Sequence, residues 1–134
     1  MAKRLAVFAI ALLTLGAGRP AQSPQLGNVM HQKLERAQKI LEAVVTSDWV
    51  ALETQSRELE GLTRDPRWTV LRYPEYARYS TDFVRAVQSL RDAAARRELE
   101  ATPKAYIAVT MGCVDCHRYL ARERIALGRI DGSR

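Results

Sequence analysis

The sequence lacks the signals of β-structure. No stretch of its 134 residues alternates apolar and polar side chains as a strand does, and no Asn-Gly or Asp-Gly pair stands between two β-branched segments as in a hairpin. It also contains no internal repeat and no low-complexity tract, and its length suits one domain. These absences predict a single all-α domain.

Long hydrophobic runs are scarce as well. A helix that spans a bilayer needs about 20 apolar residues, whereas the longest run, Leu5 to Leu15, is about half that length. The run follows the basic pair Lys3-Arg4 and precedes several small residues, which is the pattern of a secretory signal peptide. A retained membrane anchor is the alternative, and the glycines and the proline that break the run disfavour it.

We therefore expect a signal peptide over residues 1–23, with cleavage between about residues 18 and 23, and a mature domain over residues 24–134. Such a chain is exported, for example to the periplasm, and is not stably inserted in a membrane after cleavage. Loss of the three basic residues of the signal lowers the formal net charge from +6 to +3. The basic character is thus weak evidence for a nucleic-acid partner, and we expect none.

Apolar residues that recur every three to four positions predict four amphipathic helices. Thr46-Ser47-Asp48 places three capping residues between the first two, and Thr102-Pro103 is a start signal for the last. Because short connections make successive helices antiparallel, we expect an antiparallel four-helix bundle. The expected ranges are about 28–46, 49–62, 80–100 and 102–125, followed by a loose tail. The apolar stripe expected on the first helix is made of these residues, the last three of which join the main repeat: Leu26, Met30, Leu34, Ala37, Leu41, Val44, Val29, Ile40 and Val45.

The segment from 64 to 79 is the least regular part, with two prolines, one tryptophan and three tyrosines. Leaving such rings in water would forfeit their burial energy, so we expect a crossover that folds back onto the bundle. Pro74 suits the first position of a short helical turn.

The two cysteines stand together in the pentapeptide Cys113-Val114-Asp115-Cys116-His117. On a helix, side chains three and four positions apart share one face, so Cys113, Cys116 and His117 can meet a single flat cofactor. This spacing is the attachment pattern of a c-type haem. It predicts one haem c, covalently bound through both thiols, with the His117 imidazole as a ligand of the iron.

The pentapeptide has three alternative interpretations: a redox-active cysteine pair, a disulfide and a zinc site. A redox-active Cys-x-x-Cys normally stands in a βαβ setting, and strand signals are absent. A disulfide between residues three apart would strain a regular helix. A zinc site would need His31 as its fourth ligand, but His31 falls on the polar side of the first helix and is expected to point to water.

A four-helix bundle with this motif on its last helix resembles the cytochrome c prime family, the class II c-type cytochromes. The chain departs from the family pattern at Ala121, where members often carry a basic residue four positions after the haem histidine. The residues that carry the resemblance are Met30, Lys33-Leu34, Gln38 to Glu42, Asp48-Trp49, Trp68, Pro74 to Phe83 and Tyr106 to Tyr119. The resemblance also implies a homodimer that pairs through the first two helices.

The second axial ligand of the iron decides the function. The family packs its first helix on the distal face of the haem, which implies Met30 as the distal ligand, although a methionine in a helix stripe is ordinarily a core residue. Met111 lies on the same helix as His117 and cannot reach that face. With Met30 bound, the chain would be an electron carrier that serves redox partner proteins; with the position open, it would be a five-coordinate haem protein that binds gases such as nitric oxide or carbon monoxide.

An enzyme is not expected, because no pair of acid or base side chains is evident near the distal side. Arg72 and Arg78 are candidates to pair with a haem propionate. Four aromatic residues are candidates to pack on the porphyrin, with ordinary core packing as the alternative: Trp68, Tyr76, Phe83 and Tyr106.

Overall fold

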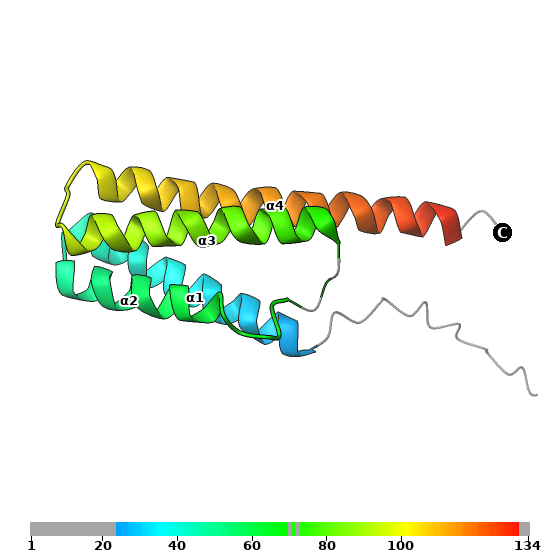
Figure 1. Cartoon of the computed structure of the whole chain (residues 1–134), viewed down its shortest axis with the longest axis horizontal. Coiled ribbons are helices and arrows are strands. Elements are labelled where there is room, and N and C mark those ends of the chain that lie inside the picture. Colours follow the sequence, from blue (N-terminus) through cyan, green and yellow to red (C-terminus); the bar gives the residue numbers. More distant parts are fainter. Residues whose placement is uncertain (1–23, 70, 72, 132–134) are drawn as a thin grey trace, which may run out of the picture.

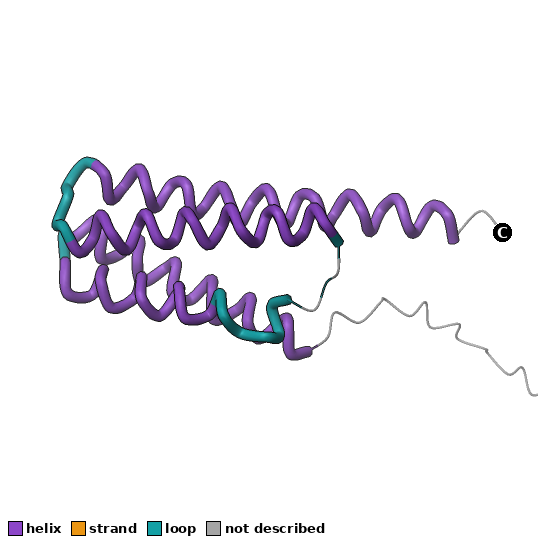
Figure 2. The backbone as a smooth tube through the Cα atoms, in the orientation of Figure 1, coloured by secondary structure: helices purple, strands orange, loops and turns teal. Residues whose placement is uncertain are grey.

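Four helices make up the part of the chain that the structure describes. The computed structural model describes residues 24–69, 71 and 73–131, so the predicted signal peptide and Arg72 lie outside the described residues. Successive helices run in opposite directions, and the described residues contain no strand (Figures 1 and 2). The predicted all-α four-helix bundle is confirmed. Its helices are α1 (Pro24–Thr46), α2 (Trp49–Leu62), α3 (Pro74–Ala95) and α4 (Ala101–Asp131).

The helices form two close pairs. α1 packs mainly on α2, and α3 mainly on α4, while contacts between α2 and α3 join the pairs. An ion pair spans this junction, since the partly exposed Arg91 of α3 approaches the buried Glu60 carboxylate of α2 at 2.7 Å. Arg64, just after α2, approaches the same carboxylate at 3.2 Å. None of the described helices has the length and apolar character that crossing a bilayer requires.

The predicted break between the first two helices is confirmed. Ser47 adopts a left-handed conformation with φ of 54°, and the amides of Ser47 and Asp48 donate to the carbonyl oxygens of Val44 and Ala43. This is a Schellman ending, which satisfies the last carbonyls of α1. The Asp48 carboxylate then accepts from the Ala51 amide at 3.0 Å and caps α2.

The predicted boundaries of the last two helices were wrong. α3 begins at Pro74 rather than near Ser80, because proline fits the first turn of a helix. It ends at Ala95 rather than Glu100, because Arg97 turns left-handed with φ of 54°. α4 runs on to Asp131 where a loose tail was expected. Thr102 is not a cap: its buried hydroxyl has no hydrogen-bond partner among the described residues.

The crossover between α2 and α3 buries part of its aromatic content, as predicted. Trp68 and Tyr76 are buried, and the Tyr76 hydroxyl donates to the Trp68 carbonyl oxygen at 2.6 Å. Arg67 holds the Asp65 carboxylate beside it. Tyr73, by contrast, is exposed. The crossover thus contributes the buried side chain of Trp68 to the core.

The predicted apolar stripe of α1 was partly wrong. The buried face runs through Val29, Lys33 and Ile40, whereas Leu34 and Leu41 are 57% and 47% exposed. The reason is the helical period: residues at 29, 33 and 40 lie on one face, whereas 34 and 41 each follow one of these positions and therefore point about 100° away from it. A lysine therefore occupies an inward position of α1.

Candidate functional site

The pentapeptide lies within α4, so the predicted shared face exists. Cys113 and Cys116 are half-buried, carry free thiols and pack against the hydrophobic core. His117 is exposed beside them. The helix thus turns two thiols inward and leaves an imidazole at the edge of the same face.

Aromatic side chains of the core lie on the side of the bundle where the thiols pack. Trp68 and Phe83 meet edge to face, with ring centroids 5.7 Å apart and planes at 84°, and both are buried. Gly112 of α4 faces Phe83 of α3, and a Cβ at position 112 would lie 3.4 Å from Phe83 Cδ2, at the short end of ordinary van der Waals contact. Cys113 therefore follows a residue at the contact between α3 and α4.

Met30 borders the same core from α1. It is half-buried and packs against the hydrophobic cluster that Cys113 and Cys116 also contact. The other methionine considered, Met111, is 47% exposed on α4. His31 is exposed, as predicted, and its Nδ1 lies 2.8 Å from the Gly27 carbonyl oxygen. The structure therefore brings Met30 to the core that holds the thiols and leaves Met111 and His31 outside it.

Sequence reasoning missed a further member of the site, Lys33. Its side chain is only 9% exposed, and its Nζ lies 3.8 Å from the centroids of both the Trp68 and the Phe83 rings. Among the described residues no carboxylate pairs with it. The signal was its spacing, since Lys33 stands four positions after Val29 and seven before Ile40, on the inward face of the helix.

The electrostatics of the site follow from this buried ammonium. Burial lowers the pKa of Lys33 to about 8, and the thiols of Cys113 and Cys116 act in the opposite direction. Burial also raises the pKa of both thiols, an effect that the charge of Lys33 opposes. Burial, with the nearby Cys116, raises the pKa of Tyr76 to about 12. At neutral pH the site thus holds one cation, two thiols and a phenol.

These residues fit a planar, largely apolar group with acidic substituents. Two thiols on one helical face offer two covalent anchors, and the neighbouring core is aromatic. The unneutralised Lys33 ammonium would be stabilised by a negative charge, because a buried cation without a counter-ion is costly. No three His, Cys, Asp or Glu side chains of the described residues group closely enough to hold a metal ion by themselves. The zinc alternative therefore gains no support.

Two other candidate residues have partners of their own. Tyr106 donates its hydroxyl to the Ala37 carbonyl oxygen of α1 at 3.1 Å, so it links α1 to α4. Arg78 pairs with Glu75 and Asp82 and lies over the Tyr79 ring. Arg78 is thus already neutralised.

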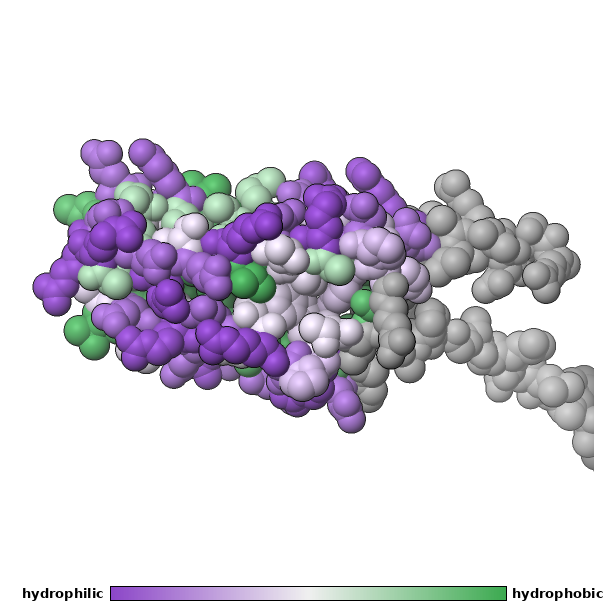
Figure 3. All heavy atoms as spheres, in the orientation of Figure 1, coloured by the Kyte–Doolittle hydropathy of each residue, from purple (hydrophilic) through white to green (hydrophobic). Residues whose placement is uncertain are grey.

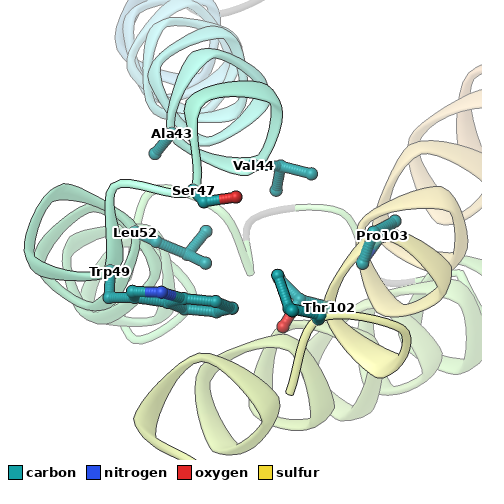
Figure 4. Close-up of a pocket in the computed structure, with 8 residues that line it drawn as sticks. Ala43, Val44, Ser47, Trp49, Leu52, Thr102 and Pro103 are labelled. Atoms are coloured by element: carbon teal, nitrogen blue, oxygen red, sulfur yellow. The ribbon is translucent and has the colours of Figure 1, made fainter. Parts of the chain in front are cut away.

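A small cavity lies at the opposite end of the bundle, where the connections between α1 and α2 and between α3 and α4 meet (Figure 4). Its volume is about 20 Å³, which suffices for one water molecule and not for a cofactor. The buried Thr102 hydroxyl is among its lining groups. This cavity is therefore a place for a bound water rather than a functional site.

No protein-family model, curated protein or solved structure matches the chain. The resemblance to the cytochrome c prime family rests on the residues quoted for it and on the bundle that carries them.

Proposed function

We propose that the chain is a monohaem c-type cytochrome that carries single electrons between exported redox proteins. The observation that carries the proposal is the placement of Cys113, Cys116 and His117 on one face of α4, with both thiols packed against an aromatic core. Cys113 and Cys116 would hold the haem through two thioether bonds, and haem held in this way would supply a one-electron iron couple.

Different residues of the chain would bind the two sides of the haem iron. His117 would be the proximal ligand of the iron, and its imidazole has no hydrogen-bond partner among the described residues that would hold it elsewhere. Ala121 offers no side chain that could tune this histidine. Met30 would be the distal ligand, supported by its half-buried place on the core that the thiols contact. A thioether ligand raises the reduction potential and closes the position to gases, which suits electron transfer.

Replacing Met30 by alanine tests the distal assignment. The variant should change from a low-spin to a high-spin spectrum, bind carbon monoxide rapidly and have a lower reduction potential, because the iron loses its sulfur ligand. Met111→Ala is the matched control: it removes a methionine that is exposed on α4, and it should leave spectrum and potential unchanged.

The same spectra separate electron transfer from gas binding. If wild-type protein is already high-spin and binds carbon monoxide at once, the five-coordinate gas-binding function replaces the one proposed. An unchanged ligand-field spectrum in Met30→Ala would exclude Met30 as the ligand.

A further inference from the structure

Lys33 occupies a position that packing alone does not explain. A lysine side chain ordinarily keeps its ammonium in water, yet this one ends between two buried aromatic rings, 3.8 Å from each centroid. Other lysines of the described part keep to the surface; Lys39, on the same helix, is exposed and pairs with Glu35 at 2.8 Å. A buried cation without a counter-ion costs stability, so stability does not account for a lysine at position 33 and a functional role would.

The charge of Lys33 reaches the thiols of the pentapeptide. It acts electrostatically on both Cys113 and Cys116 and opposes the effect of their burial. Burial lowers the pKa of Lys33 only to about 8, so the ammonium keeps most of its charge at neutral pH. Tyr76, whose pKa is also affected by Cys116, is neutral there because its pKa is about 12. Asp115 and His117 lie in the pentapeptide itself, and no ion pair joins Asp115 to Lys33 among the described residues. Lys33 is thus a buried cation without a carboxylate partner in the described part of the chain.

We propose that Lys33 raises the reduction potential of the haem group, because its ammonium, held between Trp68 and Phe83 in the core that the attachment cysteines contact, favours the reduced state. The inference rests on the proposed function and goes beyond it by assigning a tuning residue. Reduction adds one negative charge at the iron, and a nearby positive charge attracts the reduced form more strongly than the oxidised form. Two unit charges about 10 Å apart in protein surroundings shift such an equilibrium by about tenfold.

Potentiometric titration of the haem-loaded protein tests this role. Lys33→Met should lower the reduction potential by about 59 mV, which corresponds to a tenfold change for one electron. Lys33→Arg keeps the charge and should stay close to wild type. Lys39→Met removes an exposed charge from the same helix and should change the potential little, because solvent screens it.

Lys33→Gln provides a polar neutral variant in case Lys33→Met fails to fold, and it should show the same fall. Equal potentials in wild type, Lys33→Arg and the neutral variant would overturn the role of Lys33, while the proposed function would stand. Failure of the wild-type chain to acquire haem would overturn both.

A second measurement needs no haem. In the haem-free chain, Lys33→Met should slow alkylation of Cys113 and Cys116 by iodoacetamide at pH 7, where wild-type Lys33 keeps most of its charge, because loss of the cation raises the pKa of both thiols and reduces the thiolate fraction. Lys33→Arg should alkylate as wild type does. Identical rates in wild type and Lys33→Met would show that the charge does not reach the thiols and would overturn the inference.

Discussion

At the scale of single residues, the pentapeptide could be predicted from the sequence, whereas the burial of Lys33 depends on how the helices pack. The pentapeptide is local, so the shared face of Cys113 and Cys116 followed from helical spacing alone. The burial of Lys33 did not, because it depends on which face of α1 meets the core and on two rings from other parts of the chain. Lys33 rather than Leu34 therefore lies on the inward face.

The lowered pKa of Lys33 predicts how stability depends on pH. Below about pH 8 the ammonium is charged in both states, so its burial disfavours the folded state fully. Between about 8 and 10.5 the folded chain gives up this proton before the unfolded chain does, so the penalty fades as pH rises. Wild type should therefore gain up to about 3 kcal/mol relative to Lys33→Met over this interval.

Urea unfolding of the two haem-free proteins at pH 7 and at pH 10 measures this gain. Because Lys33 also affects the pKa of both thiols, Cys113 and Cys116 are replaced by alanine in both proteins, and the difference between them then isolates Lys33. A difference in unfolding free energy that does not change with pH would contradict the burial of the ammonium.

At the scale of the helix, the boundary between α1 and α2 was predicted well because it carries capping residues. The end of α3 was predicted poorly because it carries none. Thr46-Ser47-Asp48 marked the end of α1 and the start of α2, and the structure uses Asp48 as the cap. The end of α3 carries no glycine or proline. The Schellman ending there is formed by Arg97 in a left-handed conformation. An arginine in the sequence does not indicate such a conformation.

Arg97→Gly should stabilise the protein by about 1 kcal/mol. A side chain with a Cβ is strained at φ of 54°, and glycine adopts this conformation without strain. Thermal or urea unfolding measures the gain. Arg96→Gly is the control: Arg96 is right-handed with φ of −86° and pairs with Glu98, so its replacement should bring no gain. Equal effects of the two changes would argue against a left-handed Arg97.

At the scale of the whole molecule, the bundle was predicted correctly because four periodic segments with short connections have few ways to pack. The positions of exposed apolar side chains on its surface were harder to predict. Hydrophilic side chains cover much of the face in Figure 3, and apolar ones stand at the end where the helix connections lie. The exposed residues of α1 and α2 include Leu34, Leu41, Val45 and Val50. The expected homodimer through the first two helices stays a prediction.

The most direct test of covalent haem attachment is to express the full chain with a haem-attachment system and to examine it after denaturation. We predict one haem per chain that stays bound in denaturant, with both thiols blocked to alkylation, and loss of that bound haem when Cys113 and Cys116 are replaced by alanine. A chain that shows no haem absorption, and whose two cysteines both remain free to react, would contradict the proposed function.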